Sequence, residues 1–493
     1  MVAGKIVAIG DMAGANGAEV VDAAGRVVAP GFIDVHIHSE SSIVDSTNSY
    51  RHGSMLQGVT THLTAPDGFG WAQLPPDKAR QMWTYTRFGH DGPAPALDWP
   101  TAADYLAVFG GHTAVNVAPQ VPHLAVRFAV MGWDDRPATD DEIRRMERLT
   151  MDWLDEGAVC LNLGLDYMPT ASADMREIVA LSKLAHSAGA IYAAHARYAR
   201  LGRVEAWRET FEIGRRSGIP VHISHEVVND ETEPLFDEAS GVCDLTFESY
   251  LYPAGCTHLA LALPFWAQAG GPDAVRQRLA DPVQRDRIRA AMQEKLTAEG
   301  ERGFLVFAAT QTGRWIGQDM RDAARAEGME MGDFALKVLD EEDPYALMVY
   351  HRGYEPDEAA DIARRTIRHP QMMVASDGVY HGAGAHPRGF GCFARVLRQS
   401  VRQTQAISLD EAVWKMSGFP AERFRIGDRG FIREGLAADL VIFDMDTVAD
   451  RATWTEPRLE PVGVERVIVN GVTTVLNGRV TGAVPGQVVR RRA

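Results

Sequence analysis

Short apolar runs alternate with amphipathic segments through the middle of the chain. The runs at 190–195, 219–225 and 371–378 have the length and composition of buried strands. The segments at 203–218 and 357–369 place apolar residues at helical spacing. This alternation extends over roughly 350 residues and favours βα units around a parallel sheet. The pattern therefore predicts an α/β barrel in which active-site residues follow the carboxyl ends of the strands.

Both ends of the chain show a different pattern, with period-2 apolar residues separated by Gly, Asp and Asn turns. Near the start, KIVAIGD and GRVVAPG flank a glycine-rich turn, and ADLVIFD, ERVIVNG, TTVLNG and QVVRR follow one another near the end. We expect the two ends to form one small β domain, a β-sandwich. The predicted boundaries are 1–30 and 431–493 for this domain and 31–430 for the barrel.

The composition is ordinary for a soluble globular enzyme and does not identify a substrate. The 493 residues are 46% hydrophobic and 24% charged, which is enough for a large core. The 66 acidic against 50 basic residues argue against a nucleic-acid partner. No apolar stretch reaches the ~18 residues that a membrane span needs. The four cysteines form no C-x-x-C pair, and the first residues lack a secretory leader pattern, so we expect a cytoplasmic protein.

Two histidines close the apolar stretch PGFIDVHIHSE at 30–40. Residues two apart in a strand point to the same side, so His36 and His38 can reach one metal ion. The alternative interpretation is a pair of surface histidines on a strand.

Three further apolar runs end in a potential metal ligand. His195 closes YAAHAR, His225 closes VHISH after His222, and Asp377 closes MMVASD. One such strand end would be weak evidence, because buried histidines often only satisfy backbone groups. Several together give a set of nitrogen and oxygen donors that suits zinc or a similar divalent ion.

This combination resembles the amidohydrolase superfamily, in which H-x-H follows strand 1, single histidines follow strands 5 and 6, and an aspartate follows strand 8. The segments GAVCLNLGLDYMP, YAAHAR, IPVHISH, YLYPAGCT, VASDGVYHGAGAHPRGFGCFARVL and AERFRIGDRGFIREGLAADLVIFD are similar to the N-acyl-D-amino-acid deacylase (D-aminoacylase) family. The resemblance runs from about Lys5 to the C-terminus. It implies a (β/α)8 TIM-type barrel and hydrolysis of an amide bond.

The resemblance also implies a role for each ligand. His36 and His38 would belong to one metal position, and His195 and His225 would hold the catalytic zinc. Asp377 would be both a ligand and the general base, taking a proton from the metal-activated water and passing it to the leaving amine.

Four further residues are candidates for substrate binding. Arg388, in the H-P-R segment, resembles the family's bidentate clamp for the substrate α-carboxylate. Tyr252 resembles a tyrosine that holds the same carboxylate. His62 is a candidate donor to the amide carbonyl, and His386 is a candidate for a supporting position. The alternatives are a salt-bridging arginine, a core aromatic residue and loop histidines.

The chain departs from the family pattern at several positions. Asp67, in GVTTHLTAPDGFG, replaces a metal-binding cysteine. A carboxylate is a harder ligand than a thiolate, so we expect Asp67 to bind one or two divalent ions, zinc or alternatively manganese. Val227, beside Glu226, replaces a lysine that binds the substrate carboxylate in the family, which weakens the case for a substrate with a free carboxylate. Family members usually have about 30 more residues before KIVAIGD, so either the small β domain is incomplete or the start codon is misassigned.

Three functional hypotheses follow. The first is a zinc amidase that deacylates an N-acyl-D-amino acid or a related compound. The second is an amidohydrolase acting on a cyclic amide, a lactone or a secondary-metabolite amide; the strand-4 segment GAVCLNLGLDYMP disfavours it, because it lacks the lysine that bridges two metals in hydantoinases. The third is a non-catalytic barrel that binds a ligand. No GxGxxG follows a predicted strand, so no nucleotide cofactor is indicated.

Overall fold

Parallel strands form the centre of the molecule in the computed structural model, which describes residues 1–12, 17, 19–90, 94–342 and 346–492. Three strands pair in the order β2-β4-β5, and six more pair in the order β6-β7-β8-β9-β10-β14. Their bounds are β2 (Phe32–Asp34), β4 (Val59–Leu63), β5 (Asn116–Ala118), β6 (Val121–Pro122), β7 (Cys160–Gly164), β8 (Ile191–His195), β9 (Val221–Ile223), β10 (Leu245–Ser249) and β14 (Met372–Val374).

Backbone hydrogen bonds close these strands into a ring. The amide of Val159 donates to the Pro119 carbonyl (2.8 Å), which connects the two sheets. At the other junction the Asp377 amide donates to the His36 carbonyl (2.8 Å). Strand β15 (Gly378–Val379) then pairs in parallel with β3 (Ile37–His38). Since β5 and β6 are two halves of one strand position, the described residues form the predicted barrel of eight positions.

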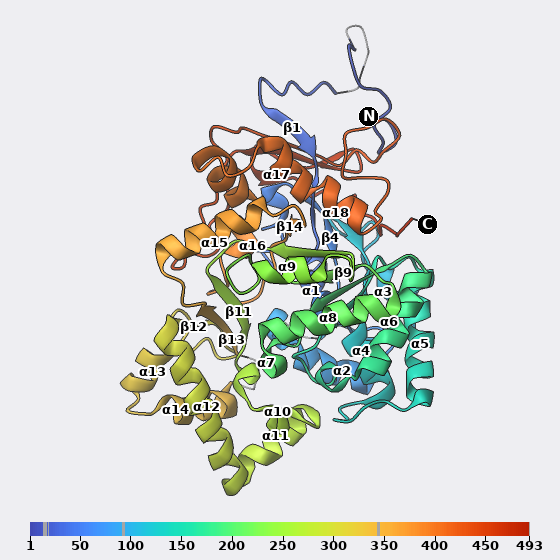
Figure 1. Cartoon of the computed structure of the whole chain (residues 1–493). Helices are drawn as coiled ribbons and strands as arrows, with labels where there is room; N and C mark the ends of the chain where they lie inside the picture. The colour runs from blue at the N-terminus through green and yellow to red at the C-terminus, as the bar shows by residue number, and fades with distance from the viewer. Residues whose placement is uncertain (13–16, 18, 91–93, 343–345, 493) are drawn as a thin grey trace.

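Helices follow the strands and cover the outside of the barrel (Figure 1). Helix α5 (Asp140–Asp155) begins at a capping box between Thr139 and Glu142 and buries Ile143 and Trp153. The helices around the barrel are α1 (Glu40–Val44), α2 (Pro76–Tyr85), α3 (Ala102–Leu106), α4 (His123–Met131), α6 (Met175–Ser187), α7 (Tyr198–Leu201), α8 (Arg203–Ser217), α9 (Glu233–Ala239), α15 (Pro356–Arg368), α16 (Arg388–Arg395), α17 (Leu409–Met416) and α18 (Gly418–Arg423).

Two apolar clusters divide the core. One cluster lies between strands and helices and includes Trp153 and Trp207. The second contains inward-facing strand residues, such as Ile33 and Met373, together with Phe424, which directly follows the last barrel helix. Because the barrel interior is packed with side chains, its polar residues gather where the strands end.

Both chain ends contribute to the second domain, as predicted. Strand β1 (Val27–Pro30) pairs antiparallel with β16 (Leu440–Phe443), and the sheet continues through β17 (Val464–Val469), β18 (Val472–Leu476) and β19 (Arg479–Val480). The described strands of this domain belong to one five-stranded sheet, so the two facing sheets of the predicted β-sandwich are not seen among them. KIVAIGD makes only isolated bridges, from Lys5 to Val2 and to Ala437. Part of the predicted glycine-rich turn lies outside the described residues.

An inserted subdomain, not anticipated from the sequence, lies between β10 and β14. Its strands β11 (Ala254–His258), β12 (Leu305–Ala309) and β13 (Leu347–His351) pair antiparallel in the order β11-β13-β12. Its helices are α10 (Phe265–Gln268), α11 (Gly271–Ala280), α12 (Pro282–Arg302), α13 (Met320–Ala326) and α14 (Met331–Glu341). Figure 1 shows it as a separate yellow-green lobe beside the barrel. In the described part of the chain, no helix is both long and apolar enough to cross a bilayer.

Candidate metal centre

The structure brings all six predicted ligands together at the carboxyl ends of the strands. They come from five strand positions that are far apart in the sequence, as a barrel active site requires. The predicted ligands are His36 and His38 after β2, Asp67 after β4, His195 at the end of β8, His225 after β9 and Asp377 after β14.

His36 and His38 face two carboxylates. The Nε2 atom of His36 lies 3.6 Å from Asp67 Oδ1 and 3.6 Å from Asp377 Oδ1. The Nε2 atom of His38 lies 3.7 Å from Asp67 Oδ2 and 3.3 Å from Asp377 Oδ1. Two ligands that share a zinc ion at 2.0–2.2 Å are about 3.4 Å apart in a tetrahedral site. These spacings therefore suit ligands around a common cation.

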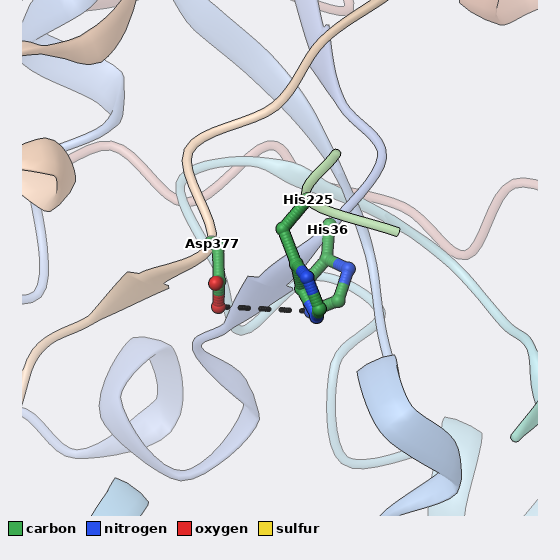
Figure 2. Close-up of side chains that lie close together, drawn as sticks. All are labelled: His36, His225 and Asp377. Carbon is green, nitrogen blue, oxygen red and sulfur yellow. Dashed lines mark ion pairs between the residues drawn. The ribbon is translucent and has the colours of Figure 1, made fainter. Parts of the chain in front are cut away.

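A second group of donors adjoins the first. His195 Nδ1 and His225 Nε2 lie 3.0 Å apart, and Asp67 completes a potential ligand group with them. His225 also forms a group with His36 and Asp377, whose side chains point toward one another in Figure 2. Asp67 belongs to both the His36–His38 group and the His195–His225 group, so its carboxylate is placed to bridge two metal positions.

The buried atoms of the cluster fit a cation. His36 Nε2 and Asp67 Oδ1 are buried and have no hydrogen-bond partner among the described residues. Burial alone would lower the pKa of His36, but Asp67, Asp377 and Glu248 raise it to about 10. Such an excess of buried carboxylate charge favours a positive charge at this place, and the oxygen and imidazole donors suit zinc or manganese.

Three ligands have left-handed backbone conformations. The φ angles are 56° at Asp67, 45° at His225 and 47° at Asp377. Such angles are costly for residues with a Cβ and persist only where the surroundings impose them. The backbone at each strand end is therefore bent to direct a ligand into the cluster.

Two carboxylates that the sequence interpretation missed hold the histidines in place. Glu248, on β10, accepts from His36 Nδ1 (2.9 Å) and from the His225 amide (3.0 Å). Asp166, after β7, bonds His195 Nε2 at 3.0 Å and leaves Nδ1 for the cluster. Their signal was present, because each acidic residue lies at or just past the end of an apolar strand.

The cluster opens into a cavity of about 600 Å³ between the barrel and the inserted subdomain. Arg388 lines this cavity, and its Nη1 lies 2.9 Å from Asp377 Oδ2. Its guanidinium also stacks on the ring of Tyr250, 4.5 Å from the centroid. Arg388 therefore lies beside the predicted metal ligands, and its role as a carboxylate clamp stays a prediction.

Three predicted substrate-binding residues lie elsewhere. Tyr252 lines a separate hollow, in which the Arg395 guanidinium lies over its ring. Tyr250 lies in the main cavity, at the place where we expected Tyr252. Both nitrogens of His62 are engaged, by the Ser39 hydroxyl (2.9 Å) and the Ser54 hydroxyl (2.8 Å), so this imidazole cannot also donate to a substrate.

His386 is directed at the backbone rather than at the cavity. Its Nε2 bonds the Ala254 carbonyl at 3.0 Å, and its Nδ1 accepts from the Arg388 amide at 3.0 Å. His386 therefore supports the start of the helix that carries Arg388, which corrects its assignment to substrate binding.

Comparison with known proteins identifies the family. A model of the amidohydrolase family matches residues 19–249 and 262–475. The chain belongs to the amidohydrolase family. This amidohydrolase is 33% identical to D-aminoacylase of Alcaligenes xylosoxydans xylosoxydans, over 99% of this chain and 92% of that protein. N-acyl-D-glutamate deacylase of the same organism is 32% identical, over 99% and 91%.

Solved structures agree with this relationship. The crystal structure of D-aminoacylase has a TM-score of 0.79 and 30% identity, over 99% of this chain and 94% of that one. N-acyl-D-glutamate deacylase from Bordetella bronchiseptica, complexed with zinc and a phosphonate inhibitor, has a TM-score of 0.79 and 28% identity over the same shares. The resemblance to the deacylases, the barrel with a second domain and the prediction of a hydrolase acting on carbon–nitrogen bonds are thereby confirmed.

Proposed function

We propose that this amidohydrolase removes the acyl group from an N-acyl-D-amino acid or a related N-acyl compound. Support comes from the relatives, which are named D-aminoacylase, N-acyl-D-glutamate deacylase and N-acyl-D-aspartate deacylase. The observation that carries the proposal is the buried cluster in which Asp377 lies within 3.6 Å of His36 and 3.3 Å of His38. A carboxylate close to potential metal ligands is what a general base for a metal-activated water requires, which supports the proposal.

Two groups of residues would hold metal. His36, His38 and Asp67 form the first, and Asp67, His195 and His225 form the second. A divalent ion bound in either group supplies Lewis acidity, lowering the pKa of water toward ~7 and polarising an amide carbonyl.

Asp377 acts as the proton carrier. Burial raises the pKa of its carboxyl, but the charges of Arg388 and His36 outweigh burial and hold it well below the usual range. The carboxylate is therefore ionised and accepts a proton from the attacking water. It then returns that proton to the nitrogen of the leaving amine as the carbon–nitrogen bond breaks, so its own state is restored.

Other residues position these groups. Asp166 and Glu248 fix the ring orientations of His195 and His36 through their hydrogen bonds. Arg388 binds Asp377 on one side and lines the substrate cavity on the other, which makes it a candidate contact for an anionic substrate group.

Asp377→Asn tests the proposal. We expect turnover of N-acyl-D-amino acids to fall by about 10²–10⁴-fold, since the amide cannot accept the proton. Zinc content, measured by plasma mass spectrometry, should stay close to that of the wild type, because five other ligands remain.

Asp281→Asn is the matched control, because Asp281 caps α12 far from the cluster and asparagine caps a helix equally well. The wild type should first be assayed against N-acyl-D- and N-acyl-L-amino acids, hydantoins and lactones with zinc or manganese added. Full activity of Asp377→Asn would show that the base is misassigned, and hydrolysis of hydantoins or lactones alone would refute the deacylase.

A further inference from the structure

A guanidinium without an acidic partner lines the active-site cavity. Arg352 follows β13 of the inserted subdomain, and its side chain reaches the cavity that contains His225 and Asp377. Among the described residues no carboxylate lies within 4.0 Å of its charged group. Its two side-chain hydrogen bonds, both from Nη2, go to the Tyr250 hydroxyl and to the His225 carbonyl (3.4 Å).

Two other cations of this cavity are paired with carboxylates, and a third is held by a backbone carbonyl. Arg388 pairs with Asp377 at 2.9 Å, and Arg203 lies 3.5 Å from Glu226 and 3.3 Å from Glu231. The Nζ atom of Lys295 donates to the Leu261 carbonyl at 2.7 Å. Arg352 thus differs from Arg388 and Arg203 in having no carboxylate partner among the described residues. It differs from Lys295 and Arg302, which also line the cavity, in contacting the backbone of a predicted metal ligand, His225.

Tyr250 connects Arg352 to Arg388. The Arg388 guanidinium lies 4.5 Å from the centroid of the Tyr250 ring, and the Arg352 guanidinium lies 5.4 Å from it. Asp377 neutralises the Arg388 guanidinium, so among the described residues the Arg352 guanidinium is the charge at this ring that still lacks an anion. The remaining donors of Arg352 form a fork of the kind that binds a carboxylate.

Arg352 contacts the backbone just after β9, next to the predicted metal ligand His225. Its Nη2 touches the carbonyl of His225, two residues before Val227, whose side chain is apolar and buried. The chain segment after β9 therefore supplies no lysine or arginine to the cavity, and the inserted subdomain brings a guanidinium to within 3.4 Å of the His225 carbonyl. A substrate anion beside the metal cluster would meet Arg352 there.

We propose that Arg352 binds the carboxylate of the substrate, so that this enzyme requires an N-acyl amino acid with a free carboxylate. The inference deepens the proposed function and rests on it. It also resolves the apparent conflict between a valine at position 227 and an anionic substrate, because the positive charge comes from another element of the fold.

The test compares an acid with its neutral counterpart. The N-acetyl-D-amino acid that the wild type cleaves fastest and the corresponding C-terminal carboxamide are assayed with the wild type, Arg352→Gln and Arg352→Lys. We expect Arg352→Gln to raise KM for the acid by about 10- to 100-fold, as for loss of a charge-assisted hydrogen bond, with kcat less affected. For the carboxamide its KM should change by no more than about twofold, and Arg352→Lys should recover part of the lost affinity for the acid.

Binding without turnover gives a second readout. Calorimetric titration of the metal-depleted protein with the same two compounds should show the same loss for the acid alone. Lys295→Gln is the matched control, a cation of the same cavity whose removal should leave the ratio of acid to carboxamide unchanged. Equal effects of Arg352→Gln on both compounds, or no effect on either, would overturn the role of Arg352. Failure of the wild type to cleave any N-acyl amino acid would instead overturn the proposed function.

Discussion

At the residue scale, the charge of Asp67 distinguishes this centre. Its carboxylate belongs to two potential ligand groups and replaces the cysteine of the resembled family. A carboxylate offers two oxygens and could therefore give a donor to each group; Oδ1 lies 3.6 Å from His36 and Oδ2 lies 3.7 Å from His38, both in the first group. Oxygen ligands are harder than thiolate and widen the range of divalent ions that the site accepts.

Removing this charge should therefore weaken both metal positions. Asp67→Asn keeps the size of the side chain and tolerates the left-handed backbone, but a neutral amide is a poor ligand. We expect zinc to be largely lost on dialysis.

Asp166→Asn, which touches only His195 among the ligands, should cost about 10–100-fold in zinc affinity at one position. Competition with a chelator measures the zinc affinity of each variant. Full retention of zinc by Asp67→Asn would exclude bridging by Asp67.

The side chains that gather in the cluster could be predicted from the sequence, but several contacts around them could not. An imidazole or carboxylate at the end of an apolar strand can be recognised without knowing its neighbours. Which tyrosine of YLYPAG enters the cavity depends on the backbone after β10, and Leu251 between the two tyrosines has a left-handed φ of 59°. The period-2 alternation of a strand fails there. Arg352 comes from the inserted subdomain, whose position no local pattern specifies.

At the element scale, the close approach of two strand ends positions Asp67. A Cβ on Gly164, the last residue of β7, would lie 2.5 Å from the Asp67 carbonyl oxygen and 2.5 Å from the Tyr167 ring. The turn that carries Asp67 can therefore rest on β7 only because this position has no side chain.

Gly164→Ala should push the Asp67 turn away from the cluster. We expect a loss of about 1–3 kcal/mol in the free energy of unfolding, from overpacking, together with weaker zinc binding. Gly110→Ala is the control, since Gly110 lies in a turn where an added Cβ would meet open space and should be tolerated. Urea denaturation and zinc titration provide the measurements, and unchanged zinc affinity in Gly164→Ala would argue against this packing constraint.

The same scale shows how far periodicity predicts elements. Strands β8, β9 and β14 and helices α8 and α15 lie where the apolar runs and amphipathic segments predicted them. QVVRR and KIVAIGD have strand-like composition but form only isolated bridges, at Val488 and Lys5. Strand formation depends on a partner in the folded molecule, which composition does not reveal.

At the scale of the whole molecule, the C-terminal segment returns to the barrel. The Val117 amide of β5 donates to the Gln487 carbonyl (2.9 Å), and the Val489 amide donates to the Val117 carbonyl (2.8 Å). Val489 is 5% exposed and packs with Phe424 and Ile426 in the cluster that fills the barrel interior. The tail therefore contributes to the stability of the barrel as well as to the second domain.

Truncating the Val489 side chain should lower the free energy of unfolding. Val489→Ala removes about two buried methylene equivalents, for which we expect a loss of about 1.5 kcal/mol in the free energy of unfolding. Val484→Ala, at a residue that is 45% exposed, should stay within about 0.5 kcal/mol of the wild type. The shift of the urea midpoint at constant slope distinguishes the two. Equal midpoints would show that the tail does not stabilise the barrel.

The existence and type of the barrel followed from alternating strands and helices, and both ends were expected in one domain. The inserted subdomain was not predicted. Its strands β11, β12 and β13 pair antiparallel, and three α-helices separate β11 from β12. Its helices and strands read as further βα units in the sequence. Only the pairing partners distinguish the two arrangements, and those are set by tertiary contacts.

The most direct measurement of the central claim is the anomalous scattering of zinc in crystals of the zinc-loaded protein. The account predicts at least one strong peak about 2.0–2.2 Å from an Asp67 oxygen and from the nitrogens of either His36 and His38 or His195 and His225. Crystals of zinc-loaded protein with no peak among these six side chains, while the enzyme remains active, would contradict it.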